Sequence, residues 1–300
     1  MLAYVGSRPG NLLPRFAVTS CAAALLLPSG AFALQRSEAP DGRHAAVLAA
    51  NVGAGALTAG VRALIEGTDF SRAVARGALG GALGYAGKRI AVERWQPAPF
   101  LGRTVGALGS SIIASAGDSG ALLDSAWIPV GPLHLGFFRE RRLRPRVIIV
   151  ALDLLVTLRT LADPDRHLDW TRTFSAGAPV FRTGGSYFGR DGQRLNGSHT
   201  AGVIVLDRNL AERVEAASFA HEVVHVLQYD FSRIVWDRPV ERWLRRTVPG
   251  GGFVPAWLDL GVLIPLLGRA LDGLNDGNGI HRTVMEAEAD WFESLHGVSW

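Results

Sequence analysis

Cysteine and lysine are almost absent from this chain of 300 residues. Its one cysteine is Cys21 and its one lysine is Lys88, so the other 30 of its 31 basic residues are arginine. A single cysteine excludes an intrachain disulfide framework and a metal site built from several thiolates. The arginine excess accompanies abundant glycine and alanine, as in GC-rich bacterial coding sequences. The pI of 9.8 is therefore weak support for nucleic-acid binding, and we predict no nucleic-acid partner.

Charge is also scarce, because only 19% of the residues are charged and the mean hydropathy is +0.18. Residues 45–61 carry no charge, but they are rich in glycine and alanine rather than leucine. A spanning helix therefore remains open, and a helix packed within the protein is favoured. Small residues recur at helical spacing after this stretch, at Ala73, Gly77, Gly81, Gly84 and Gly87. Such a smooth face permits close helix packing, in lipid or in a soluble core.

The N-terminus has the pattern of a secretory signal peptide. Arg8 and Arg15 precede an apolar run of 12 residues, and Ala31-Phe32-Ala33 offers a small-residue cleavage site. We predict cleavage after Ala33 and export to the periplasm, the cell envelope or the outside. Cleavage would remove Cys21 and lower the net charge from +4 to +2. An uncleaved anchor, or a lipid-modified Cys21, remains an alternative.

The rest of the chain predicts an α+β fold in two parts. Residues 34–125 read as a Gly/Ala-rich helical region of unknown role, in which Thr68-Asp69 offers a helix N-cap. Residues 126–300 read as a domain in which an active-site helix packs against a small sheet. Strands are predicted at 127–138, 147–158, 178–183 and 202–208. The second of these is expected to be long and half-buried because its even positions are all apolar, and 163–170 is expected to be a loop.

The densest chemistry lies in SFAHEVVHVLQYD, residues 218–230. A helix from about Leu210, capped by Asp207 or Asn209, would place the polar residues of this segment on one stripe: Ser218, His221, Glu222, His225 and Tyr229. Two imidazoles one turn apart can bind one metal ion. A glutamate beside the first lies near that ion without binding it. A polar surface helix with two histidines is the alternative, and it requires no further ligand.

A third ligand is offered by MEAEADWFE, residues 285–293, where Glu286 and Asp290 lie one turn apart. Together the two segments resemble the gluzincin zinc metallopeptidases, which place His-Glu-x-x-His on one helix and Glu-x-x-x-Asp on a later one. The resemblance covers about 208–230 and 284–293. It implies Zn²⁺ on His221, His225 and Glu286, with Asp290 accepting a hydrogen bond from a ligand histidine, and peptides or proteins as substrates.

Two assignments remain open within this site. Amphipathicity alone would bury Glu288, so it competes with Glu286 as third ligand, although only Glu286 has an aspartate four residues on. For a group that stabilises an oxyanion, Tyr229 is the first candidate because it shares the stripe of the two histidines. His199 and His281 are the others.

Two further segments bear on substrate and location. Residues 202–208 (GVIVLDR) fit either the edge strand along which zincins bind an extended substrate or a buried structural strand. Residues 254–271, with tryptophans and arginines nearby, fit an interfacial helix at a membrane surface or a lid over the cleft.

We therefore predict an exported zinc metallopeptidase in which Glu222 takes a proton from the attacking water. A non-hydrolytic zinc-binding scaffold and a membrane-associated glycine-zipper protein are the alternative functions.

Overall fold

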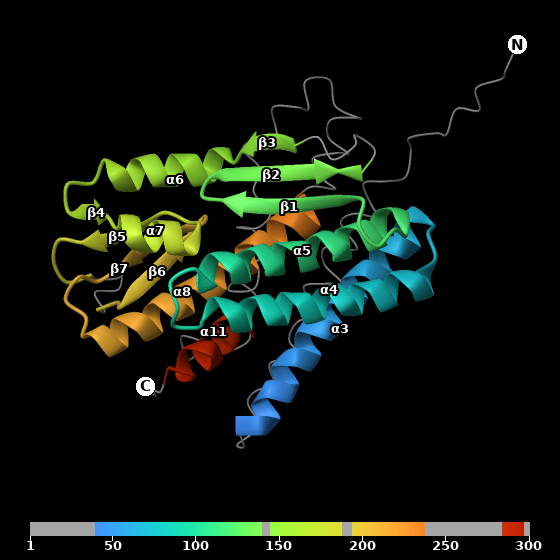
Figure 1. Ribbon diagram of the computed structural model, residues 1–300, viewed down its shortest axis with the longest axis horizontal. Coiled ribbons are helices and arrows are strands. Elements are labelled where there is room, and N and C mark those ends of the chain that lie inside the picture. The colour runs from blue at the N-terminus through green and yellow to red at the C-terminus, as the bar shows by residue number, and fades with distance from the viewer. Residues whose placement is uncertain (1–39, 140–144, 188–193, 238–283, 297–300) are drawn as a thin grey trace, which may run out of the picture.

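The computed structural model describes residues 40–139, 145–187, 194–237 and 284–296 (Figure 1). Helices dominate these residues and two small sheets accompany them, so a mixed α+β composition is confirmed. The predicted signal peptide (1–33), the segment 254–271 and His281 lie outside the described residues.

Three helices form the glycine-rich region: α3 (Pro40–Glu66), α4 (Phe70–Ala91) and α5 (Ala98–Ser119). Helix α4 packs against both of the others (Figure 1). Asp69 is the N-cap of α4, as predicted, and its side chain accepts a hydrogen bond from the amide of Arg72 at 3.0 Å. Among the described helices, α3 alone is long and apolar enough to cross a membrane. A core helix of a soluble protein can have the same properties, and a third of this apolar window is buried within the protein.

Some glycines of α4 and α5 lie where a side chain would clash with a neighbouring helix, and others lie in open space. A Cβ on Gly81 would lie 2.2 Å from the carbonyl oxygen of Asn51 in α3, and one on Gly102 of α5 would lie 2.3 Å from the carbonyl oxygen of Gly87. These distances are far below van der Waals contact, so only glycine allows the helix backbones to approach so closely. A Cβ on Gly84, by contrast, would meet no atom within 4 Å.

We therefore expect Gly81→Ala and Gly84→Ala to have opposite effects on stability. Alanine at position 81 must push α3 and α4 apart, which should lower the free energy of unfolding by about 1–3 kcal/mol. Alanine at position 84 should leave it unchanged or raise it by up to about 1 kcal/mol, because glycine is a poor helix former. Urea unfolding of the two variants measures both. Equal destabilisation would contradict this packing.

A meander of three antiparallel strands follows: β1 (Ser125–Val130), β2 (Leu133–Phe138) and β3 (Pro145–Ile149). A second sheet has the order β4-β5-β7-β6. Its strands are β4 (Arg166–Leu168), β5 (Val180–Thr183), β6 (Gly197–Thr200) and β7 (Val203–Leu206). Strands β5 and β7 are parallel and the other pairs are antiparallel. Helix α7 (Trp170–Ala176) connects β4 to β5.

The long strand predicted at 147–158 is wrong, because the chain leaves β3 at Ile149 and forms helix α6 (Ala151–Leu161). The helix buries Asp153 and Thr160 and exposes Leu155, so two of its polar residues face inward while an apolar one faces outward. The apolar alternation therefore did not mark a buried sheet face. The loop predicted at 163–170 is also wrong, since it contains β4 and the start of α7.

Of the two readings of residues 202–208, the edge strand is wrong and the buried strand is confirmed. Strand β7 lies between β5 and β6, and all four of its residues are buried. The uninterrupted apolar run Val-Ile-Val-Leu is typical of a strand covered on both faces. Within the described residues, β6 forms the edge of this sheet.

Helix α8 (Glu212–Ser232) runs behind the glycine-rich helices and continues into a π-helical turn, η2 (Arg233–Asp237) (Figure 1). One side of α8 packs on the second sheet through a core of Val180, Ile204, Leu206, Val223, Val226 and Leu227. Its N-cap is Ala211, so the predicted caps Asp207 and Asn209 are wrong. Asp207 instead accepts hydrogen bonds from the amides of Tyr187 and Asn209.

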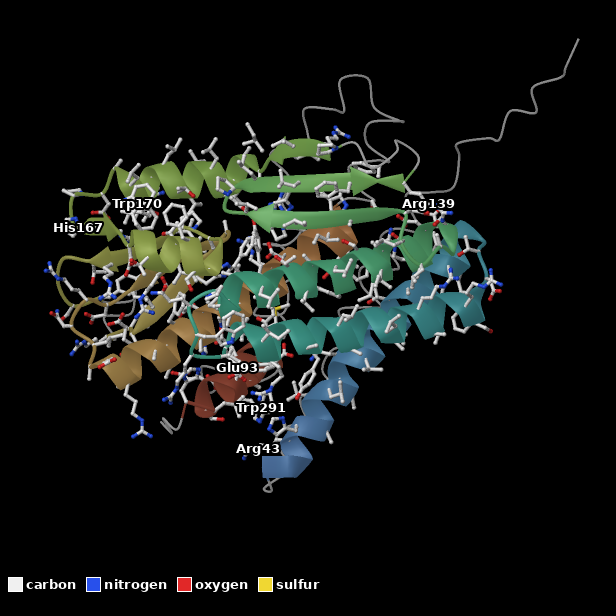
Figure 2. All side chains as sticks on the ribbon, viewed as in Figure 1. Arg43, Glu93, Arg139, His167, Trp170 and Trp291 are labelled. Carbon is white, nitrogen blue, oxygen red and sulfur yellow. The ribbon has the colours of Figure 1, made fainter. Side chains whose placement is uncertain are left out.

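Helix α11 (Val284–Ser294) packs against α8. Its apolar residues Ala289, Trp291 and Phe292 join a core with Val47, Val92, Ala220 and Val224, which belong to α3, to the end of α4 and to α8. Trp291, labelled in Figure 2, packs edge-on against the ring of His44 in α3, with the ring centroids 4.7 Å apart. Because this face of α11 is fixed in the core, the helix presents Glu286 towards α8.

Candidate metal centre

Three predicted ligand atoms converge where α11 meets α8. His221 Nε2 lies 3.0 Å from His225 Nε2, and Glu286 Oε2 lies 3.4 Å and 3.3 Å from these two nitrogens. A tetrahedral ion with bonds of about 2.0–2.1 Å holds its ligand atoms about 3.3 Å apart. The separations in this cluster therefore fit one such ion, and His221, His225 and Glu286 are brought together as the sequence predicts.

Carboxylates surround the other nitrogen of His221. Its Nδ1 lies 3.0 Å from Glu293 Oε2 and 3.5 Å from Asp290 Oδ1. Asp290 is thus near the ligand histidine, as predicted, but Glu293 makes the hydrogen bond. Glu293 was not predicted to belong to the site, although it lies seven residues after Glu286 and so shares its helix face. In the neutral imidazole with Nδ1 donating to Glu293, the lone pair of Nε2 would point into the cluster.

His225 is oriented in the same way by a neutral group. Its Nδ1 lies 2.8 Å from Gln228 Oε1, which can only accept a hydrogen bond. In the neutral form of His225 the lone pair of Nε2 would therefore also point into the cluster. Three unshared electron pairs at 3.0–3.4 Å repel one another unless a cation lies between them. A proton or a metal ion between these three atoms would remove that repulsion, so the cluster could hold a cation.

The pKa shifts of His221, His225 and Glu286 show that positive charge is favoured in the cluster. Burial opposes the charging of His221, but its hydrogen bonds to Glu286 and Glu293 outweigh burial and raise its pKa to about 10. Burial likewise opposes the charging of His225, and the hydrogen bond to Glu286 raises its pKa. Burial would raise the pKa of Glu286, but the two imidazoles hold it well below its usual range. The carboxylates thus favour positive charge in the cluster, from protons or a metal ion.

Glu222 lies next to the cluster without being one of its three ligands. It is 6% exposed, and a Cβ on Gly197 of β6 would lie 3.0 Å from its Oε1. Glycine at this position therefore leaves room for the carboxylate. Burial raises the pKa of Glu222 to about 6, although the charges of His225 and His221 oppose the shift. Such a carboxylate can both accept and release a proton near neutral pH.

Glu288 points away from the imidazoles. Its Oε1 accepts a hydrogen bond from Asn51 at 2.7 Å, and its Oε2 accepts from Lys88 at 2.6 Å and from Gln228 at 2.9 Å. The structure therefore places Glu286, and not Glu288, in the ligand cluster. Asn51 and Lys88 belong to α3 and α4, so the glycine-rich region contacts the surroundings of the site. No residue of the glycine-rich region was predicted to take part in the site.

Tyr229 lies on the helix face that the sequence predicts, but its hydroxyl is engaged elsewhere. It donates to Asp153 Oδ1 at 2.6 Å and accepts from Arg233 at 2.9 Å. These contacts tie α8 to α6 in a buried polar group, and they give no support to its predicted role as an oxyanion donor.

His199 on β6 is the other described candidate for the oxyanion donor, and its ring centroid lies 6.3 Å from that of His225. Burial and the charge of His225 lower its pKa to about 3, so the ring is neutral. Its Nε2 accepts a hydrogen bond from the amide of Gly202 at 3.1 Å. An acceptor at Nε2 requires the proton on Nδ1, which leaves an N–H donor beside the ligand helix.

Comparisons with protein-family models, with curated proteins and with solved structures found no match to this chain. Its function therefore has to be inferred from the chemistry of the cluster itself.

Proposed function

We propose that this protein is a zinc-dependent hydrolase that cleaves peptide bonds. The observation that carries the proposal is the convergence of His221 Nε2, His225 Nε2 and Glu286 Oε2 within 3.0–3.4 Å of one another. A second carboxylate, that of Glu222, lies beside them and is not one of the three ligands. Two imidazoles and one carboxylate are a known ligand set of catalytic zinc, and they leave a fourth position for water or substrate.

A bound zinc ion would polarise the carbonyl group of the substrate and would lower the pKa of a bound water molecule to near neutrality. Glu222 would accept the proton of that water and pass it to the leaving amine. Its burial and its raised pKa of about 6 suit both steps. Glu293 and Gln228 would hold the ligand imidazoles in place through their Nδ1 atoms.

Strand β6 would align the substrate. It is the edge of its sheet within the described residues, and it supplies Gly197 beside Glu222 and His199 beside His225. An extended peptide could add to this edge by main-chain hydrogen bonds, which would bring its carbonyl groups along the cluster. The neutral Nδ1–H of His199 would then be a donor available to a developing oxyanion.

The test is hydrolysis of an unfolded protein such as reduced, alkylated casein, followed by the appearance of new amino termini. We expect cleavage by the zinc-loaded chain, loss of cleavage after removal of the metal with a chelator, and recovery when one equivalent of zinc is restored. Cleavage that persists in metal-free protein would contradict the proposal. Stoichiometric zinc without cleavage of any peptide tested would favour a zinc-binding scaffold.

A further inference from the structure

The only lysine of the chain is buried and is linked to the ligand cluster of His221, His225 and Glu286 through Glu288 and Gln228. Lys88 of α4 has a side chain that is 11% exposed, and its Nζ donates to Glu288 Oε2 at 2.6 Å and to Asn51 Oδ1 at 2.9 Å. Asn51 of α3 in turn donates to Glu288 Oε1 at 2.7 Å. Both oxygens of Glu288 are therefore held by side chains of the glycine-rich helices.

The carboxylate of Glu288, held in this way, fixes the orientation of the Gln228 side chain. The amide nitrogen of Gln228 donates to Glu288 Oε2 at 2.9 Å and to the carbonyl oxygen of Met285 at 3.1 Å. A carboxylate and a main-chain carbonyl can only accept hydrogen bonds, so both fix the same amide orientation. The remaining atom, Gln228 Oε1, faces His225 Nδ1 at 2.8 Å and must accept its proton.

Donors and acceptors thus alternate along a defined path from α4 to the metal cluster. The ammonium of Lys88 can only donate and the carboxylate of Glu288 only accepts, so each later bond has one allowed direction. The path ends with the proton of His225 on Nδ1 and the lone pair of Nε2 towards Glu286. We propose that Lys88 and Asn51 are positioning residues that set the tautomer and orientation of the ligand His225. The proposal rests on the metal site proposed above.

The surroundings of this path make it sensitive to the loss of one charge. Lys88, Asn51, Gln228 and Glu288 also line a cavity of about 320 Å³, whose other walls are mainly glycine, alanine and larger apolar side chains of α3, α4, α5 and α8. In such surroundings a carboxylate that has lost its cation is strongly destabilised and draws on other donors. Removal of the ammonium should therefore disturb the bond between Glu288 and Gln228, and through it the ligand imidazole.

A purely structural ion pair would give a different result, and a matched variant separates the two. Arg62 of α3 is also buried, pairs with Asp118 and donates to the carbonyl oxygen of Val235 at 2.7 Å. Within the described part of the chain, its hydrogen bonds and ion pair go to Asp118 and Val235 and not to Gln228 or Glu288. Arg62→Met therefore removes a buried cation from the same helices without touching the path to His225.

The experiment is competition for Zn²⁺ between the full-length chain and a chromophoric chelator at one fixed pH and ionic strength. Loss of a group that orients a metal ligand typically weakens metal binding about 10- to 100-fold. We expect a loss of this size for Lys88→Met, a smaller loss for Asn51→Ala, which keeps the ion pair, and a change of less than about twofold for Arg62→Met. Thermal unfolding of the metal-free proteins records the stability of each variant.

Zinc affinity within about twofold of wild type in Lys88→Met would overturn the inference, as would an equal loss in Arg62→Met. If Lys88→Met does not fold, Asn51→Ala decides, and unchanged zinc affinity in that variant would overturn it. Wild-type protein that binds no zinc would instead contradict the proposed function, and the inference with it. The wild-type and variant titrations thus tell the two failures apart.

Discussion

Glu222→Gln is expected to keep the full zinc content of the protein and to lower peptide hydrolysis by about 10²–10⁴-fold, the range for loss of a general base. Glutamine has the size of glutamate, so it fits the buried space beside Gly197. It cannot accept a proton from the attacking water. The zinc content should stay because Glu222 is not one of the three converging ligands.

The rate is measured with saturating zinc, beside Glu212→Gln as a control. Glu212 lies exposed in the first turn of the same helix, and its replacement should leave hydrolysis unchanged. Cleavage by Glu222→Gln at the wild-type rate would show that another group moves the proton.

Glu286→Ala removes one of three ligand atoms. It is therefore expected to weaken zinc binding by more than the 10- to 100-fold that is typical when a residue hydrogen-bonded to a ligand is replaced. The side chain is 35% exposed, so its removal should not disturb the core. Glu293→Gln keeps all three ligands and alters the group that bonds His221 Nδ1, so it should fall within the 10- to 100-fold range.

Asp290→Asn should have the smallest effect of the three, since Asp290 lies 3.5 Å from the same nitrogen. Chelator competition measures all of these variants. A zinc affinity for Glu286→Ala equal to that of Glu293→Gln would place the ion elsewhere.

The sequence predicts the ligand cluster well because both of its motifs are local. His221 and His225 are one turn apart on α8, and Glu286 lies on α11, whose apolar residues fix its orientation against α8. Helical periodicity is enough to place such residues on one face. The choice between Glu286 and Glu288 could not be made in this way, since it depends on Lys88, which lies 200 residues before Glu288 and bonds to it.

The rest of the site depends on contacts that no local pattern encodes. Strand β6 lies in a polar glycine-rich segment that reads as a connection, yet it brings Gly197 to Glu222 and His199 to His225. Helix α6 was predicted as a strand because its even positions are apolar, but the helix buries Asp153, whose carboxylate accepts a hydrogen bond from Tyr229 of the distant helix α8. A buried polar residue whose partner is remote in sequence reads as exposed, so the apparent period is misleading.

The most direct test of the account is a zinc titration of the purified chain, combined with X-ray absorption at the zinc edge. We predict one tightly bound ion per chain with two imidazole nitrogens among its ligands, and loss of that binding in His225→Ala. A chain that binds no zinc, or whose zinc lacks imidazole ligands, would contradict the account.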